Sequence, residues 1–106
     1  ATTLGVRDRA LILLGFAGAM RRSELVGLDV TDVAMTDDGL VVVVRKSKTD
    51  QTGVGRKIGI PFGEHVETCP VRAVLAWIDE AEIEDGPLFR GVNKHGHVSD
   101  SRLSDK

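Results

Sequence analysis

The sequence predicts an α+β fold that is mostly helical and contains a small antiparallel β-sheet. Two apolar stretches, at about 6–18 and 70–82, have the length or the spacing of helices. Two short runs rich in β-branched residues, at 40–44 and 57–61, flank a glycine-containing segment and indicate a hairpin. We therefore expect helices packed against a few short strands, within one domain or part of one.

The first predicted helix, at about 6–18, is apolar nearly all round, which is typical of a helix that is buried rather than lying at the surface. A second, short helix is expected at about 22–28. Ser23 and Glu24 suit a helix start, and Gly27 weakens the far end.

The central part of the chain has the pattern of short strands. Residues 30–35 are rich in β-branched side chains, and the Asp-Asp-Gly sequence at 37–39 is a turn signal. The apolar run at 40–44 is short enough to favour a strand, and 57–61 alternates as a half-buried strand should. These two strands are expected to form a hairpin with a long tip.

The third predicted helix starts at Pro70, a residue that suits a first helical position, and continues to about residue 82. Trp77 is expected at the edge of this helix. The Asp-Gly-Pro sequence at 85–87 ends the element. Residues 90–102 are polar and without clear periodicity, so we expect a loop there.

The composition is that of a globular protein. Of the 106 residues, 42% are hydrophobic and 28% are charged, which is enough apolar material for one core. We see no signal segment and no apolar run near the roughly 18 residues of a membrane span, so no membrane partner is expected. The single cysteine, Cys69, excludes an internal disulfide and favours a reducing, cytoplasmic location.

Positive charge is concentrated in the expected hairpin tip. The chain has a net charge of −2, whereas residues 45–57 alone carry +4 and the remainder sums to −6. The basic residues of this segment are Arg45, Lys46, Lys48, Arg56 and Lys57. A molecule with one cationic face can bind a polyanion despite an acidic total. The alternative is a solvated hairpin tip without a binding role.

Arg21 and Arg22 lie together at the expected start of the short helix. Guanidinium groups beside unpaired backbone N–H groups are suited to a phosphate. In the alternative interpretation, one arginine pairs with Glu24, the other is solvated, and the junction has no function.

The sequence gives little support for metal or nucleotide sites. A structural zinc site usually has two close pairs of ligands, and His95 and His97 form one weak pair. A glycine-rich phosphate loop is absent, and Cys69 has no neighbouring base that would indicate a nucleophile. We therefore expect no cofactor.

Residues 9–14 and 18–28 resemble the first box of the tyrosine recombinase (phage integrase) family. That box reads approximately Gly-Leu-Arg-x-Ser-Glu-Leu after an apolar helix, and here Ala-Met at 19–20 replaces its leading Gly-Leu.

Later motifs extend this resemblance over nearly all 106 residues. Ser-Lys-Thr at 47–49, followed by Arg56 and by Ile-Pro at 60–61, is similar to the family's β-hairpin that carries a catalytic lysine. The helix start at 69–73 and Pro-Leu-Phe at 87–89 also occur in integrase-like chains.

The resemblance implies roles for individual residues. Arg21 corresponds to the first catalytic arginine, which contacts the scissile phosphate, and Lys48 to the hairpin lysine, which acts as general acid, with Lys46 as the second choice. Glu24 would support Arg21. The residues expected to contact the DNA backbone are Arg22, Arg45, Lys46, Arg56 and Lys57.

Members of this family break and rejoin double-stranded DNA through a phosphotyrosine, without a metal or nucleotide cofactor. The chain departs from the family pattern because it has no tyrosine and no His-x-x-Arg box. We therefore interpret residues 1–106 as the N-terminal half of a catalytic domain whose C-terminal boxes are missing. Such a fragment of a site-specific recombinase is expected to be inactive alone and to act with other recombinase protomers in the full-length protein.

Two other hypotheses compete with this one. In the first hypothesis, the chain is a non-catalytic module that binds DNA or a recombinase partner through its basic hairpin. In the second, it is a structural or small-molecule domain unrelated to DNA. Salt-sensitive binding to duplex DNA distinguishes the first from the second, because neutralised phosphates release counterions.

Overall fold

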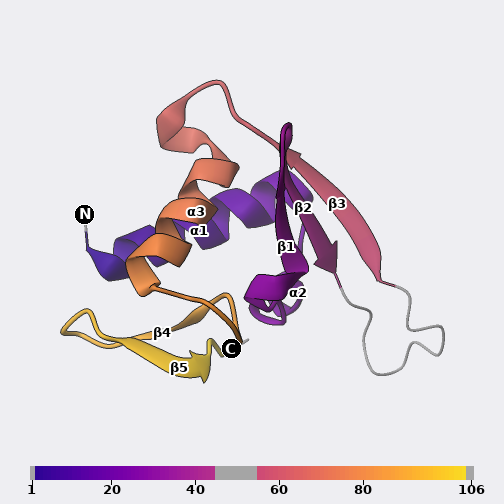
Figure 1. The fold of residues 1–106 in the computed structure, drawn as a ribbon. Helices are drawn as coiled ribbons and strands as arrows, with labels where there is room; N and C mark the ends of the chain where they lie inside the picture. The colour runs from indigo at the N-terminus through magenta and orange to yellow at the C-terminus, as the bar shows by residue number, and fades with distance from the viewer. Residues whose placement is uncertain (1, 45–54, 105–106) are drawn as a thin grey trace.

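The computed structural model describes residues 2–44 and 55–104. It confirms the predicted α+β class (Figure 1). The elements are the helices α1 (Thr3–Gly18), α2 (Arg22–Val26) and α3 (Pro70–Ala81), the strands β1 (Val33–Thr36), β2 (Gly39–Val44), β3 (Arg56–Pro61), β4 (Arg90–Val92) and β5 (Val98–Arg102), and the short 3₁₀ turns η1 (Val30–Asp32) and η2 (Val66–Thr68).

Helix α1 begins earlier than predicted because Thr2 caps it. The Thr2 hydroxyl accepts a hydrogen bond from the Gly5 N–H at 2.9 Å, which satisfies one of the free donors of the first turn. The expectation that this helix is buried is wrong for one of its faces. Leu14 is fully buried, whereas the side chains of Ile12 and Phe16 are 67% and 89% exposed. Because this helix is apolar on nearly all sides, its sequence does not indicate which face packs against the rest of the protein.

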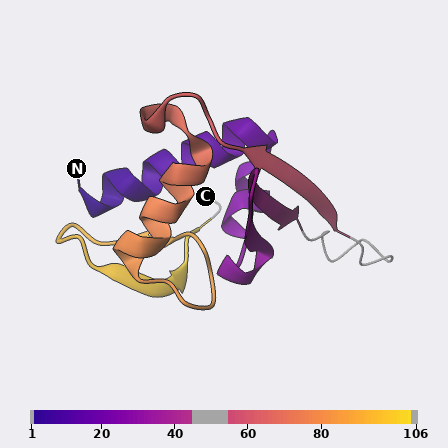
Figure 2. The same ribbon diagram turned by 45° about the horizontal axis from the view of Figure 1, so that its top comes forward.

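The main core forms where α3 crosses α1, and both views show the two helices side by side (Figures 1 and 2). Trp77 is fully buried there, so its expected position at the edge of α3 is wrong. Its indole N–H donates to the Leu88 carbonyl at 2.7 Å. This bond lets the polar atom of a large apolar side chain be buried without cost.

The three-stranded antiparallel sheet has the order β1-β2-β3 and lies beside the helical pair (Figure 2). The predicted hairpin is confirmed, with Leu40 opposite Ile60 and Val44 opposite Arg56. Gly39 starts β2 with φ +145°, and a Cβ there would lie 2.1 Å from the Ile60 carbonyl oxygen. Only glycine fits this position.

Residues 90–102, predicted as a loop, form the β4–β5 hairpin instead. Strand β5 is largely solvent-exposed and β4 is only partly buried, so the polar and apolar residues do not alternate as they do over a core. The turn is built by Asn93, whose side-chain oxygen accepts from the N–H groups of His95 and His97 at 2.8 and 3.0 Å. Local side-chain to backbone bonds of this kind leave little trace in hydrophobic periodicity.

Within residues 2–44 and 55–104, no helix has both the length and the apolar character needed to cross a membrane.

Candidate nucleic-acid interface

Arg21 occupies the turn between α1 and α2, and its side chain is exposed. The turn is fixed from both sides. Ala19 adopts the left-handed conformation that ends α1, and the buried Met20 donates its N–H to the Gly15 carbonyl at 2.9 Å. A Cβ at Gly15 would lie 2.9 Å from Leu25 Cδ1, so the glycine allows α2 to approach α1 closely. Arg21 therefore projects from an ordered junction.

Glu24 connects this junction to the sheet. Its Oε1 accepts a hydrogen bond from the Arg21 N–H at 2.8 Å. Its Oε2 lies 2.9 Å from Nη1 of Arg56, the first residue of β3, and a second contact of 3.3 Å joins Nη2 to Oε1. The Arg56 guanidinium and then the Arg21 N–H hold the pKa of the Glu24 carboxyl below its ordinary value, because both favour the ionised form.

Glu24 therefore contacts the Arg21 backbone and the side chain of a second arginine, while its supporting role for Arg21 stays a prediction. Arg56 is paired with Glu24, and the carboxylate raises the pKa of its guanidinium. Lys57 is the next residue of β3 and is exposed. DNA contacts by Arg56 and Lys57 remain predictions.

Three predicted site residues, Arg45, Lys46 and Lys48, lie outside the described residues. The convergence of Arg21 and Lys48 on one phosphate, which their predicted roles require, therefore stays a prediction. The described residue that precedes this segment, Val44, pairs with Arg56 in the sheet register, and Arg56 binds Glu24.

The remaining predicted residue, Arg22, contacts a residue near the other end of the described chain. Its Nη2 donates to the Ser104 carbonyl at 3.1 Å. Sequence reasoning missed this contact because 82 residues separate the two positions.

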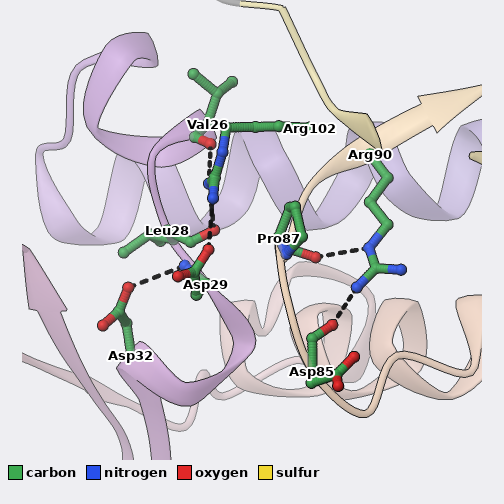
Figure 3. Close-up of polar contacts among 8 residues, drawn as sticks. All are labelled: Val26, Leu28, Asp29, Asp32, Asp85, Pro87, Arg90 and Arg102. Carbon is green, nitrogen blue, oxygen red and sulfur yellow. Dashed lines mark hydrogen bonds and ion pairs between the residues drawn. The ribbon is translucent and has the colours of Figure 1, made fainter. Parts of the chain in front are cut away.

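A second missed residue, Arg102 at the end of β5, binds the other end of α2 (Figure 3). Its Nη1 donates to the carbonyls of Val26 and Leu28 at 2.8 and 3.1 Å, and its Nη2 lies 2.6 Å from Asp29 Oδ1. The guanidinium therefore satisfies backbone acceptors at the C-terminal end of the helix. No local sequence signal joins Arg102 to residues more than 70 positions away.

The described residues contain no cluster of three or more histidine, cysteine or acidic side chains that would hold a metal ion. Cys69 is buried and its sulfur accepts from the Gly63 N–H at 3.1 Å. Burial acts to raise the pKa of this thiol, but backbone N–H groups, including that of Arg72, outweigh it and lower the pKa.

Comparison with known proteins shows similarity to recombinases. The chain is 46% identical over 102 residues to an integrase/recombinase XerD homolog of Selenomonas ruminantium, which covers 96% of the chain and 30% of that protein. It is 34% identical over 91 residues to the tyrosine recombinase XerC of Mycobacterium sp. (strain KMS), covering 81% and 26%. It is 38% identical over 74 residues to the tyrosine recombinase XerC of Xanthomonas campestris pv. campestris (strain B100), covering 70% and 19%.

The chain thus spans less than a third of the length of these curated relatives. No family model matches the chain.

Proposed function

Because this chain belongs to the tyrosine recombinase family, we propose that residues 1–106 form the N-terminal half of a recombinase catalytic domain. The complete protein would break and rejoin double-stranded DNA together with other recombinase protomers. The chain contains no tyrosine, so it cannot form a phosphotyrosine by itself. In this proposal the nucleophilic tyrosine belongs to another part of the complete protein.

In this proposal Arg21 binds the scissile phosphate. Negative charge spreads over the non-bridging oxygens during the attack on phosphorus, and a guanidinium is always charged and donates two parallel hydrogen bonds. The exposed side chain of Arg21, on a backbone fixed by Met20 and Glu24, supports this role. A preorganised donor contributes most where charge develops in the transition state.

Lys48 is the proposed general acid. When the tyrosine oxygen bonds to phosphorus, the bond to the 5′-oxygen breaks, and that oxygen takes a proton from the lysine ammonium. Lys46 is the second choice. The proposal is supported by the position of Arg56, which lies in the same basic segment as Lys48 and pairs with the carboxylate that also binds the Arg21 backbone.

That shared carboxylate, Glu24, is the observation on which the proposal depends. It ties the base of the cationic hairpin to the turn that presents Arg21. The proposed contacts to the DNA backbone, by Arg22, Arg45, Lys46, Arg56 and Lys57, then extend one positive surface around a single phosphodiester.

The test is strand cleavage by the full-length recombinase that contains this chain. Arg21→Ala should lower single-turnover cleavage by at least about 100-fold while DNA affinity changes little, because the arginine acts mainly in the transition state. Lys94→Ala, at an exposed position in the β4–β5 turn, is the matched control and should cleave normally. Cleavage by Arg21→Ala at the wild-type rate would remove Arg21 from the catalytic residues.

The concentration of positive charge at residues 45–57 also supports an alternative, a non-catalytic DNA- or partner-binding module that uses this basic hairpin. It predicts duplex binding without strand cleavage by the full-length protein. Binding affinity should then fall steeply with salt, and Lys57→Ala should reduce the slope of log affinity against log salt by about 1. Covalent capture of DNA by the full-length protein would exclude this alternative.

A further inference from the structure

Residues 102–104 run alongside α2 and bind both of its ends. At the C-terminal end, Arg102 donates to the Val26 and Leu28 carbonyls and pairs with Asp29 (Figure 3). At the N-terminal end, the Ser104 carbonyl accepts from Arg22. Between these contacts, the Leu103 N–H donates to the Phe89 carbonyl at 2.9 Å, and the Leu103 side chain packs against the core. The segment is therefore anchored to the core and to α2.

Helix α2 depends on such contacts for its position. It has five residues, far fewer than an isolated helix needs to be stable in water. Only Leu25 and Val26 of the helix are buried, so it is held by one short apolar face, by the Glu24–Arg56 pair and by its ends. Arg21 leaves one end and Arg102 binds the other, about 7 Å away along an axis that rises 1.5 Å per residue. A tilt of α2 would displace Arg21 directly.

We propose that Arg102 is a positioning residue for Arg21: by fixing the C-terminal end of α2 it holds the guanidinium of Arg21 in its productive place. This inference rests on the proposed function, since it requires Arg21 to act on the DNA. The charge on Arg102 faces the carboxylate of Asp29 and two backbone carbonyls, so both its charge and its forked geometry are used.

The β4–β5 hairpin has anchors that do not involve Arg102, so loss of this side chain should leave the hairpin in place. Arg90 on β4 donates to the Pro87 carbonyl at 2.7 Å and to the Asp85 carbonyl (Figure 3). The Arg7 guanidinium on α1 donates to the Arg90 carbonyl at 3.3 Å. The effect of an Arg102 substitution is therefore directed at α2.

The experiment measures single-turnover cleavage at saturating DNA by the full-length recombinase. Arg102→Met should slow cleavage by about 10-fold or more, since misplacement of a catalytic group by about 1 Å has effects of this size, with DNA affinity within about 2-fold of wild type. Arg102→Lys keeps the charge but not the forked geometry and should be nearly as slow. The matched control is Arg9→Met, which removes an exposed guanidinium that also donates to two backbone carbonyls, those of Val66 and Glu67.

Combination with Arg21 distinguishes positioning from general stabilisation. Arg21→Lys is expected to be slow but measurable, and the Arg21→Lys/Arg102→Met double variant should be no more than about 2-fold slower than Arg21→Lys, because both changes damage the same interaction. If the two effects multiply, the inference is wrong. It is also wrong if Arg102→Met and Arg9→Met both slow cleavage in proportion to the loss of folded protein. If Arg102→Met cleaves normally while Arg21→Lys is slow, only this inference fails. Wild-type cleavage by Arg21→Lys would overturn the proposed function as well.

Discussion

Arg56 and Glu24 form a two-point ion pair, 2.9 Å from Nη1 to Oε2 and 3.3 Å from Nη2 to Oε1, between residues 32 positions apart. The same carboxylate accepts from the Arg21 N–H at 2.8 Å. One acidic side chain therefore holds together the base of the cationic hairpin and the turn that presents Arg21. The ionisation state of Glu24 should therefore influence both the base of the hairpin and the turn that carries Arg21.

The first prediction concerns the pH dependence of stability. The pKa of Glu24 is lowered in the folded state by Arg56 and by the Arg21 N–H, so its contribution is present above the ordinary value of 4.5 and is lost as the pH falls through the lower folded-state pKa. Glu24→Gln should therefore lower the melting temperature at neutral pH, and the difference from wild type should shrink below pH 4.5. Melting temperatures measured across that range provide the test.

The control for this prediction removes the partner. In an Arg56→Met background the pH-dependent effect of Glu24→Gln should be smaller, because the main stabiliser of the ionised carboxyl is gone. Added salt should also reduce it, since the pair is partly exposed. A difference between wild type and Glu24→Gln that stays constant with pH would contradict the assignment.

The second prediction compares two glycines of the hairpin. Gly39→Ala should destabilise the protein by about 2–4 kcal/mol, because the residue has φ +145° and a Cβ would collide with the Ile60 carbonyl. Gly59→Ala, on the facing strand, meets no atom within 4 Å and should change stability by less than about 0.5 kcal/mol. Denaturant unfolding of both variants tests this. Equal effects would show that the register in which Gly39 lies opposite Pro61 is wrong.

The third prediction concerns the exposed face of α1. The side chains of Ile12 and Phe16 lie one turn apart and are 67% and 89% exposed, so the 106-residue chain on its own should self-associate through them. Ile12→Lys/Phe16→Lys should reduce this association without loss of stability. Leu14→Ala, at a fully buried position between them, should instead cost about 2–5 kcal/mol. Sedimentation velocity measures the association, and a monomeric wild-type chain would contradict the prediction.

Local signals predicted the elements that have strong patterns. The proline at position 70 and the apolar spacing that follows it identified α3. The β-branched runs identified the β2–β3 hairpin, where alternate residues such as Val42 and Val44 are buried. The β4–β5 hairpin was missed because β5 lies mostly in solvent, β4 is only partly buried, and the turn is organised by one asparagine. A strand without a buried face has no hydrophobic period to detect.

The candidate site was predicted only where its residues lie close together in the sequence. Arg21 and Glu24 are neighbours in one short motif, so the sequence alone associates them. Arg56 was predicted to contact the DNA backbone, but its pairing with Glu24 was not predicted, and Arg102 was not predicted at all. Both are placed by hydrogen bonds to residues 32 or more positions away, and pairing across such distances follows from the packing of elements rather than from any local preference.

The amino-acid sequence by itself determined the secondary-structure classes of this protein, its concentrated positive charge, its lack of tyrosine and the motif that contains Arg21. Tertiary structure decided which face of α1 is covered, how Glu24 is shared between two arginines, and how Arg102 holds α2. The physical reason is that backbone propensity and hydrophobic periodicity act over a few residues. Burial and charge pairing, in contrast, depend on which distant segments the folded chain brings into contact.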